Sequence, residues 1–369
     1  MPAGGAEIPL GIELVLAYCA LGAMAVVPIY VGSVLSLAAI GPGGVTKSEE
    51  GEVTHAEAMT ADDAKMFPII GSGVLITLFV LFKVFKLKEY VNYVLTAYFV
   101  GIGILAIMSA FVKPLLLQFA ALRHQDETEY EIKINLTPWN SSAEKTSISF
   151  TNLDLMALAV SSVAGVWYAV YKHWVANNLV ALAFAIEGTR SLSIGSFSTA
   201  TILLCGLFVY DIFHVFYSHL IFGSSTMVEV ARGLQAPIAV KFPRAVLTNP
   251  SSNLSLLGLG DIVIPGIVIA MLLRFDAFRS NGQSRLYFWV TFAAYFAGLV
   301  TTVVIMHVWA AAQPALLYLV PAVLGASLLT AAVRGELGEL YAYSEGEDEA
   351  AKSVEADDAD GEDAPTDEL

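Results

Sequence analysis

Two aspartates stand alone inside long apolar stretches of the chain. Asp211 lies in CGLFVYDIFHVF, residues 205–216, and Asp261 lies in LLGLGDIVIPGIVIAMLL, residues 256–273. A carboxylate inside a transmembrane helix is costly, so each aspartate indicates a functional site. Because the two are fifty residues apart, they must come from separate helices that pack face to face. The pattern therefore predicts a pair of carboxyl groups within the membrane.

Two such carboxyl groups have a specific chemical use. When they lie a few ångströms apart they do not easily ionise together, so they share one proton. The ionised group can activate a water while the protonated group polarises a carbonyl oxygen, which is the mechanism of an aspartic protease. The main alternative is a proton- or cation-coupled transporter or leak channel that relays ions through the same aspartates. A transporter usually shows internal repeats or paired broken helices, and none stands out here.

The residues around the aspartates fit an active site. Gly258 and Gly260 remove side chains on the approach to the second aspartate, which permits close helix packing and access by a substrate backbone. Pro265 removes a hydrogen bond one turn later and can loosen that helix. Tyr210 precedes the first aspartate and has a hydroxyl that can donate a hydrogen bond. These features predict a catalytic region around the pair.

Other chemistry-bearing residues have weaker support. His214, one turn after the first aspartate, is interpreted as a packed and satisfied histidine. Ser72 has no evident histidine-bearing partner motif, which disfavours a serine nucleophile. The zinc-binding pattern HExxH is absent, and we expect no metal and no other cofactor. An irregular helix start, open to water and substrate, is expected at Gln313, Pro314, Ala315 and Leu316.

Composition identifies the class of protein. The 369 residues are 56% hydrophobic and 14% charged, with a mean hydropathy of +0.67. Soluble domains are roughly 45–50% apolar, so the chain is expected to be a polytopic membrane protein. The net charge of −15 is concentrated in residues 336–369, which hold fourteen acidic residues and one lysine. Nucleic-acid binding therefore has no support, and this tail is expected to be disordered. Cys19 and Cys205, both in apolar runs, are expected to be buried.

A transmembrane helix needs about 20 apolar residues, and nine segments qualify. The sequence predicts an all-α fold with nine transmembrane helices, at residues 10–37, 67–87, 90–112, 153–171, 174–186, 192–216, 254–273, 286–308 and 314–333. The polar stretch 123–151 contains EYEIKINL, whose alternation fits either a short hairpin or disorder. We divide the chain into an N-terminal segment with the first span and an acidic loop (1–66), spans two to five (67–191), a catalytic region (192–335) and the acidic tail (336–369).

The basic residues indicate how the chain crosses the membrane. In membrane proteins, Lys and Arg are more frequent in the cytosolic loops than in the loops on the other side. Counting them over the loops favours an exoplasmic N-terminus and a cytosolic tail, although Lys83, Lys86 and Lys88 fall on the exoplasmic side. The start of the chain is expected to be a retained first span and not a cleaved signal peptide.

The residues singled out above match known motifs. Tyr210-Asp211, Gly258-Leu259-Gly260-Asp261 and Pro314-Ala315-Leu316 resemble the YD, GxGD and PAL motifs of intramembrane aspartyl proteases, the family of presenilins and signal peptide peptidases. Further segments resemble the signal peptide peptidase branch: FPII at 67–70, GVWYAVYKHWVANNL at 165–179, GDIVIPGIVIAMLLRFD at 260–276 and QPALLYLVP at 313–321. The resemblance covers nearly all of residues 67–336. The short segment before the first span is similar to that of members in the endoplasmic reticulum.

This resemblance implies a fold, an activity and partners. It implies a presenilin-like fold of nine spans, with Asp211 and Asp261 as the catalytic residues on the sixth and seventh. Tyr210, Gly258, Leu259, Gly260, Pro314, Ala315 and Leu316 would shape the active site. The implied substrates are remnant signal peptides and type II-oriented transmembrane segments, cleaved within the endoplasmic reticulum membrane. A lumenal N-terminus, a cytosolic C-terminus, homo-oligomers and membrane-protein degradation factors as partners are also implied.

Overall fold

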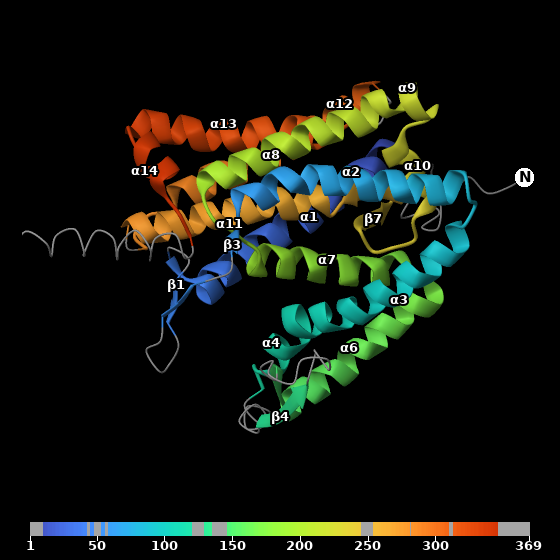
Figure 1. Ribbon diagram of the computed structural model, residues 1–369, viewed down its shortest axis with the longest axis horizontal. Coiled ribbons are helices and arrows are strands. Elements are labelled where there is room, and N and C mark those ends of the chain that lie inside the picture. Colours follow the sequence, from blue (N-terminus) through green and yellow to red (C-terminus); the bar gives the residue numbers. More distant parts are fainter. Residues whose placement is uncertain are drawn as a thin grey trace, which may run out of the picture.

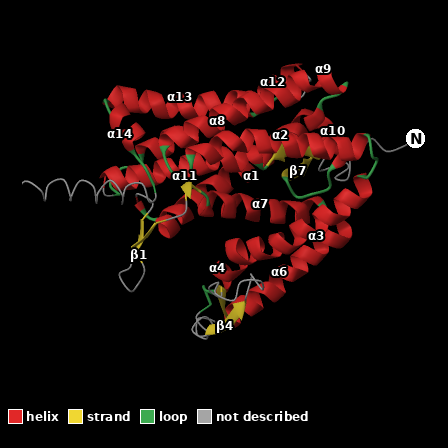
Figure 2. Ribbon diagram, viewed as in Figure 1, coloured by secondary structure: helices red, strands yellow, loops and turns green. Residues whose placement is uncertain are grey.

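The chain folds into a bundle of long helices with short two-stranded sheets at its ends (Figures 1 and 2). The computed structural model describes residues 10–42, 45–47, 53–55, 58–119, 129–134, 146–244, 254–280, 282–309 and 313–345. Within these residues, seven helical segments are long and apolar enough to cross a membrane. Four of them begin at α1 (Leu10–Ile40), α2 (Ala61–Lys83), α3 (Lys88–Ile107) and α6 (Asn152–Tyr171). The others begin at α8 (Phe197–Ile212), α12 (Leu286–Trp309) and α13 (Leu316–Arg334).

Two of these segments continue past a π-helical turn. After α3 the chain passes through Met108–Val112 into α4 (Lys113–Leu116), and after α8 it passes through Phe213–Tyr217 into α9 (Ser218–Phe222). A π-turn inserts one extra residue into a helix and is often found at functional sites. The second turn begins at Phe213, two residues after Asp211.

Two expected spans form helices that the apolarity criterion leaves out. These are α7 (Trp174–Ser191) and α11 (Gly260–Ser280). The first contains two adjacent asparagines and a charged last turn, and the second contains Asp261, Arg274 and Asp276. Both are among the most buried helices of the bundle, so their polar residues meet protein and not lipid.

Two of the predicted spans begin in strands and not in helices. The helix expected from residue 192 begins at Phe197, because Ser193–Ile194 (β6) pairs in parallel with Ala58–Met59 (β3). The helix expected from residue 254 begins at Gly260, because Leu254–Gly258 (β8) pairs with Ala239–Pro243 (β7) in an antiparallel hairpin. In both places the residues are apolar enough for a span, but their backbone groups bond to another strand. Hydropathy alone does not distinguish these two states.

Two polar segments contain regular secondary structure. In the stretch 123–151, Glu129–Ile134 (β4) pairs with Thr146–Thr151 (β5), so the alternating pattern forms a hairpin. The prediction of disorder from residue 336 was wrong for residues 336–345, which include helix α14 (Leu337–Ala342). The reason is a buried ion pair between Glu345 and Arg274, which hydropathy and charge do not reveal. Residues 346–369 lie outside the described part.

Helices α1, α7 and α11 form the centre of the bundle (Figure 1). They approach closely through glycines: a Cβ on Gly32 would lie 2.6 Å from Cβ of Thr189, and one on Gly266 would lie 2.9 Å from the Thr189 hydroxyl. On one side, α12 and α13 pack together and α8 lies between α13 and α2. On the other side, α3 and α6 pack as a pair against α7.

The outward faces of the peripheral helices are apolar. Val163 is 70% exposed on α6 and Val333 is 80% exposed on α13, as expected of surfaces that face lipid.

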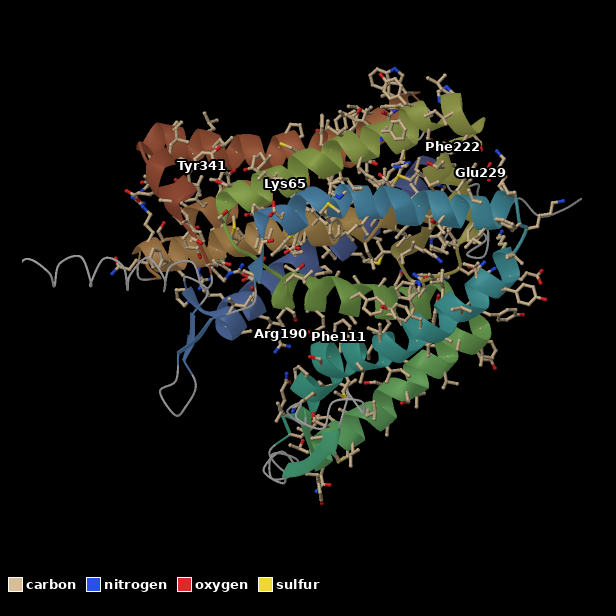
Figure 3. The ribbon with its side chains drawn as sticks, in the orientation of Figure 1. Lys65, Phe111, Arg190, Phe222, Glu229 and Tyr341 are labelled. Atoms are coloured by element: carbon tan, nitrogen blue, oxygen red, sulfur yellow. The ribbon has the colours of Figure 1, made fainter. Side chains whose placement is uncertain are left out.

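Cys19 and Cys205 are also exposed, so the prediction that they are buried was wrong. Apolar runs in a membrane bundle face either lipid or the core, and composition does not say which. Figure 3 shows Phe222 and Glu229 at one end of the bundle and Tyr341 toward the other.

Candidate functional site

Asp211 lies near the end of α8 and is 2% exposed. Its Oδ2 accepts a hydrogen bond of 3.0 Å from the backbone N–H of Leu316. Leu316 is the first residue of α13, and Ala315 before it offers no capping side chain. The first N–H groups of a helix have no partner inside that helix, so Asp211 acts as the cap of α13 from another helix. The segment Pro314–Leu316 thereby fixes the position of this carboxyl group.

Asp261 lies in the first turn of α11, directly after the β7–β8 hairpin, and stays partly exposed. A Cβ on Gly258 would lie 3.2 Å from Oδ2 of Asp261. A side chain at position 258 would therefore crowd the carboxyl group. A Cβ on Gly260 would meet nothing within 4 Å, so the glycine at this position leaves open space.

The two aspartates are close enough to interact electrostatically. Tyr210 is within electrostatic reach of both, and its ring packs over Gly71 of α2, where a Cβ would lie 3.7 Å away. Tyr210 and Leu259 pack against the same apolar cluster that contains Ala315 and Leu316. The structure thus brings together the residues predicted from three separate segments of the sequence.

Tyr295 of α12 is a site residue that sequence reasoning missed. Pro265 has no N–H, so the carbonyl of Asp261, four residues earlier, lacks its usual helical partner. The hydroxyl of Tyr295, which is fully buried, donates a hydrogen bond of 3.1 Å to this carbonyl oxygen. The signal in the sequence was Pro265 itself, since a buried carbonyl without a partner requires a donor from elsewhere.

We expect Tyr295→Phe to lower kcat on the order of tenfold, less than the roughly 10²-fold that a 1 Å misplacement can cost. The carbonyl of Asp261 would lose its donor, so the first turn of α11 would be held less firmly. Tyr287→Phe is the matched control, because it removes another buried hydroxyl from α12, one that bonds to Glu336. Equal kcat values for the two variants, measured with one peptide substrate, would contradict the role of Tyr295.

The β7–β8 hairpin presents one free edge. In an antiparallel pair, successive residues alternate between facing the partner strand and facing away from it. Lys241 lies opposite Leu256, and Ala239 lies opposite Gly258. The backbone N–H and C=O of Lys241 bond to the side chain of Asn178, on the side away from β8. Leu256 and Gly258 therefore point their N–H and C=O groups away from β7. Among the described strands, β8 pairs with β7 alone, so these groups are available beside Asp261.

His214 is fully buried and satisfied, as predicted. Its Nδ1 lies 2.9 Å from the hydroxyl of Thr226, and its Nε2 lies 3.1 Å from the hydroxyl of Ser72. The sequence showed no histidine partner for Ser72, and that inference was wrong, because the partner is 142 residues away in the chain. The third group is a threonine hydroxyl and not a carboxylate, so this cluster lacks the base-orienting acid of a serine triad.

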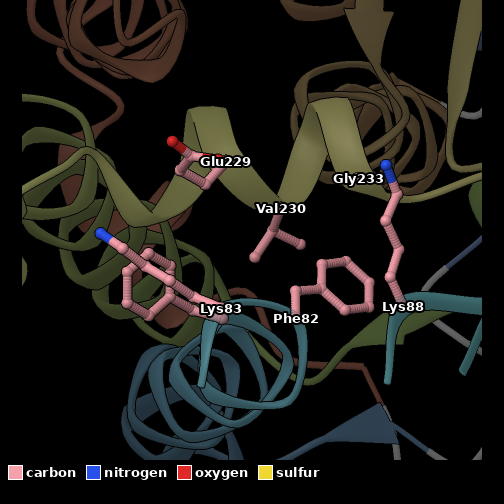
Figure 4. A pocket seen from close by; sticks show the side chains of 7 residues that line it. Phe82, Lys83, Lys88, Glu229, Val230 and Gly233 are labelled. Carbon is pink, nitrogen blue, oxygen red and sulfur yellow. The ribbon is translucent and has the colours of Figure 1, made fainter. Parts of the chain in front are cut away.

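Two further observations limit the candidate sites. A cavity of about 210 Å³ lies between the ends of α2 and α3 and helix α10 (Thr226–Gly233), lined by Phe82, Lys83, Lys88 and Glu229 among others (Figure 4). Neither aspartate lines it. Within the described part of the chain, no three His, Cys, Asp or Glu side chains gather as a metal site.

Comparison with known proteins gives a consistent result. Residues 51–347 match the family model described as signal peptide peptidase. The chain is 41% identical to mouse signal peptide peptidase, over 93% of this chain and 88% of the mouse protein. It is 41% identical to the human signal peptide peptidase, over 90% and 84%. Intramembrane protease 2 of Caenorhabditis elegans is 42% identical over 59% of this chain and 46% of its own length.

Proposed function

The chain belongs to the signal peptide peptidase family and is an intramembrane protease, and from this premise we propose that it is an aspartic endopeptidase with Asp211 and Asp261 as its catalytic pair. The observation that carries the proposal is that two lone carboxyl groups, one from α8 and one from α11, interact electrostatically within a membrane bundle. Structural ion pairs in helices normally join opposite charges, whereas two like carboxyl groups suit proton sharing.

The proposed reaction is hydrolysis by a single water. The ionised carboxyl takes a proton from water as its oxygen attacks the peptide carbonyl carbon, while the protonated carboxyl gives its proton to the carbonyl oxygen. When the tetrahedral intermediate collapses and the C–N bond breaks, the newly protonated carboxyl gives its proton to the nitrogen, and the other carboxyl takes a proton from a hydroxyl of the intermediate. The pair thus returns to one shared proton. No covalent intermediate forms, because the nucleophile is water and not a side chain.

The substrate must be extended to react. A peptide bond inside a helix is sterically screened, and its polar groups are already bonded. An unwound segment could instead add to the free edge of β8, with Leu256 and Gly258 as its backbone partners. Because Gly258 lies against the carboxyl of Asp261, a strand bound there would pass beside the catalytic pair. This mode of binding is β-augmentation, in which main-chain hydrogen bonds supply affinity.

The finer identity of the enzyme is also a proposal. We infer nine spans, with α7 and α11 added to the seven apolar ones, a lumenal N-terminus and a cytosolic tail. We infer residence in the endoplasmic reticulum membrane, with remnant signal peptides and type II-oriented segments as substrates, and homo-oligomers and degradation factors as partners. The division at residues 66, 191 and 335 remains part of this proposal. The comparisons give no support to the transporter alternative.

The test is cleavage of a labelled type II-oriented transmembrane peptide by the purified protein in detergent, with the products identified by mass spectrometry. We expect cuts inside the apolar segment, and slower turnover when the helix-breaking residues of the peptide are replaced by leucine. Unchanged turnover after those replacements would refute the requirement for unwinding. Absence of cleavage together with proton flux in proteoliposomes would instead favour a transporter.

A further inference from the structure

Strand β7 has two edges, and α7 closes the one that β8 leaves open. Asn177 donates a hydrogen bond of 2.8 Å from Nδ2 to the carbonyl of Ala239. Asn178 donates one of 2.6 Å to the carbonyl of Lys241 and accepts one of 2.8 Å from the N–H of Lys241. In Figure 1, β7 lies directly beside α7. Two side-chain amides thus bond to β7 as a neighbouring strand would.

The last residue of this edge offers no donor. Pro243 is the next residue of β7 that faces the same way, and proline has no N–H to offer. The carbonyl of Ala239 and both backbone groups of Lys241 are thus bonded to an asparagine, and Pro243 offers no donor. An incoming strand could bond here only by displacing the asparagine amides. On the outer edge of β8, the described part of the chain places no such side-chain amides.

Burying Asn177 and Asn178 within α7 costs free energy of folding. Their side chains are 0% and 5% exposed in a helix that contacts α1, α3 and α11, and asparagine is a poor helix former. Burying an amide without hydrogen bonds costs roughly 1–3 kcal/mol on protein scales. Both donors are aimed at β7, while the Oδ1 of Asn177 has no partner within the described residues. An apolar pair would pack here more easily, so the bonds to β7 explain the asparagines.

The chain before β7 is held in the same way. Asn92 of α3 donates to the carbonyl of Gly233 and accepts from the N–H of Gln235, at 3.0 and 2.9 Å. The hydroxyl of Tyr168 donates to the carbonyl of Gln235 at 2.6 Å. After β8, the N–H of Leu259 bonds to the carbonyl of Ile238 at 2.9 Å. These bonds anchor the connection from α10 and the start of α11. Within the described residues, the side chains that bond to the backbone of β7 itself are those of Asn177 and Asn178.

We propose that Asn177 and Asn178 are positioning residues that close the inner edge of β7 and fix the register of the β7–β8 hairpin against Asp261. The inference rests on the proposed function, because it assumes that an extended substrate adds to β8. With β7 occupied by side chains, the substrate strand has one edge to join. With the hairpin fixed, a single substrate peptide bond lies at the catalytic pair.

Loosening the hairpin should change where the substrate is cut. Strand pairings shift in whole residues, and a one-residue slip exchanges the two faces of the strand. A hairpin freed from α7 can move Gly258 relative to Asp261, which would bring neighbouring peptide bonds to the carboxyl groups. A purely structural role for the asparagines would lower the amount of folded enzyme without altering the cleavage position.

The experiment compares the cleavage positions of one peptide, by mass spectrometry, for the wild type, Asn178→Leu and Asn92→Leu. Asn92→Leu is the matched control, since it also removes a buried asparagine that bonds to backbone, but outside β7. We expect products from adjacent peptide bonds to rise to a share comparable with the main product in Asn178→Leu, and one unchanged main product in Asn92→Leu. The same single product from all three would overturn the inference.

A second variant covers the case in which Asn178→Leu does not fold. Asn178→Asp has nearly the same size and keeps the acceptor for the N–H of Lys241, but it loses the donor to the carbonyl. We expect a smaller spread of products from this variant, and an unchanged pattern would overturn the inference. Asp261→Asn, run beside it, should cleave the peptide at least about 10²-fold more slowly. If Asp261→Asn yields the wild-type products, the proposed function itself fails.

Discussion

Replacing either Asp211 or Asp261 by asparagine is expected to reduce peptide cleavage by about 10²–10⁴-fold, the range that general acid–base catalysis contributes. Asparagine has nearly the same shape as aspartate, but it can neither take a proton from water nor give one to the peptide carbonyl oxygen. At position 211 its oxygen can still accept the hydrogen bond from Leu316. The fold should therefore survive while the chemistry stops.

The measurement is kcat/KM for a labelled transmembrane peptide, with the thermal unfolding midpoint of each variant recorded in the same detergent. Asp276→Asn is the matched control, because Asp276 is also a buried aspartate of α11 and accepts a hydrogen bond of 2.9 Å from the N–H of Phe288. We expect this control to keep most of its activity. Wild-type turnover in either dyad variant would refute the assignment of that residue.

Replacing Glu345 by alanine is expected to destabilise the protein by about 3–5 kcal/mol, the cost of leaving a buried charge without its partner. The Arg274 side chain is fully buried, and its guanidinium bonds to both carboxylate oxygens of Glu345 at 2.8 Å and to the hydroxyl of Ser36. Ser193 and Tyr343 donate to the same carboxylate. This cluster ties α1, α11 and the residues after α14 together.

Thermal unfolding of shortened chains tests this prediction without a point substitution. A chain that ends at residue 346 keeps Glu345 and should unfold near the wild-type temperature, whereas one that ends at residue 344 should unfold at a much lower temperature. Replacing both partners, as Arg274→Met with Glu345→Leu, should cost less than the sum of the single changes, since no charge is then left buried. Equal unfolding temperatures for the two shortened chains would contradict the role of Glu345.

The two lone aspartates and the helices that carry them could be recognised in the sequence because membrane proteins rarely place a carboxylate in an apolar span. Asp211 and Asp261 each break a long apolar run, so their cost is visible in the sequence. Each of the nine predicted segments also contains a helix, since a backbone within a membrane must have its hydrogen bonds satisfied by protein. These inferences depend on local composition alone.

The contacts that hold the site could not be predicted, because they join residues far apart in the chain. Tyr295 resembles any aromatic residue of an apolar helix until the carbonyl beside it is known to lack a partner. The adjacent asparagines of α7 look like two unexplained polar residues in a short span until their hydrogen bonds to the backbone of β7 are known. Glu345 was assigned to a disordered acidic tail, since its partner Arg274 lies in another helix. In each case the sequence shows the polar group but not its partner.

The sharing of one proton by Asp211 and Asp261 is the central claim, and the pH dependence of kcat/KM tests it most directly. The substrate should be a peptide without titratable side chains, and the enzyme should regain its activity when returned to neutral pH. The pair is active only when one carboxyl is protonated and the other ionised, so log kcat/KM should rise with slope +1, pass through a maximum and fall with slope −1. A profile with a single flank, or none, would contradict a shared proton and leave one aspartate without a catalytic role.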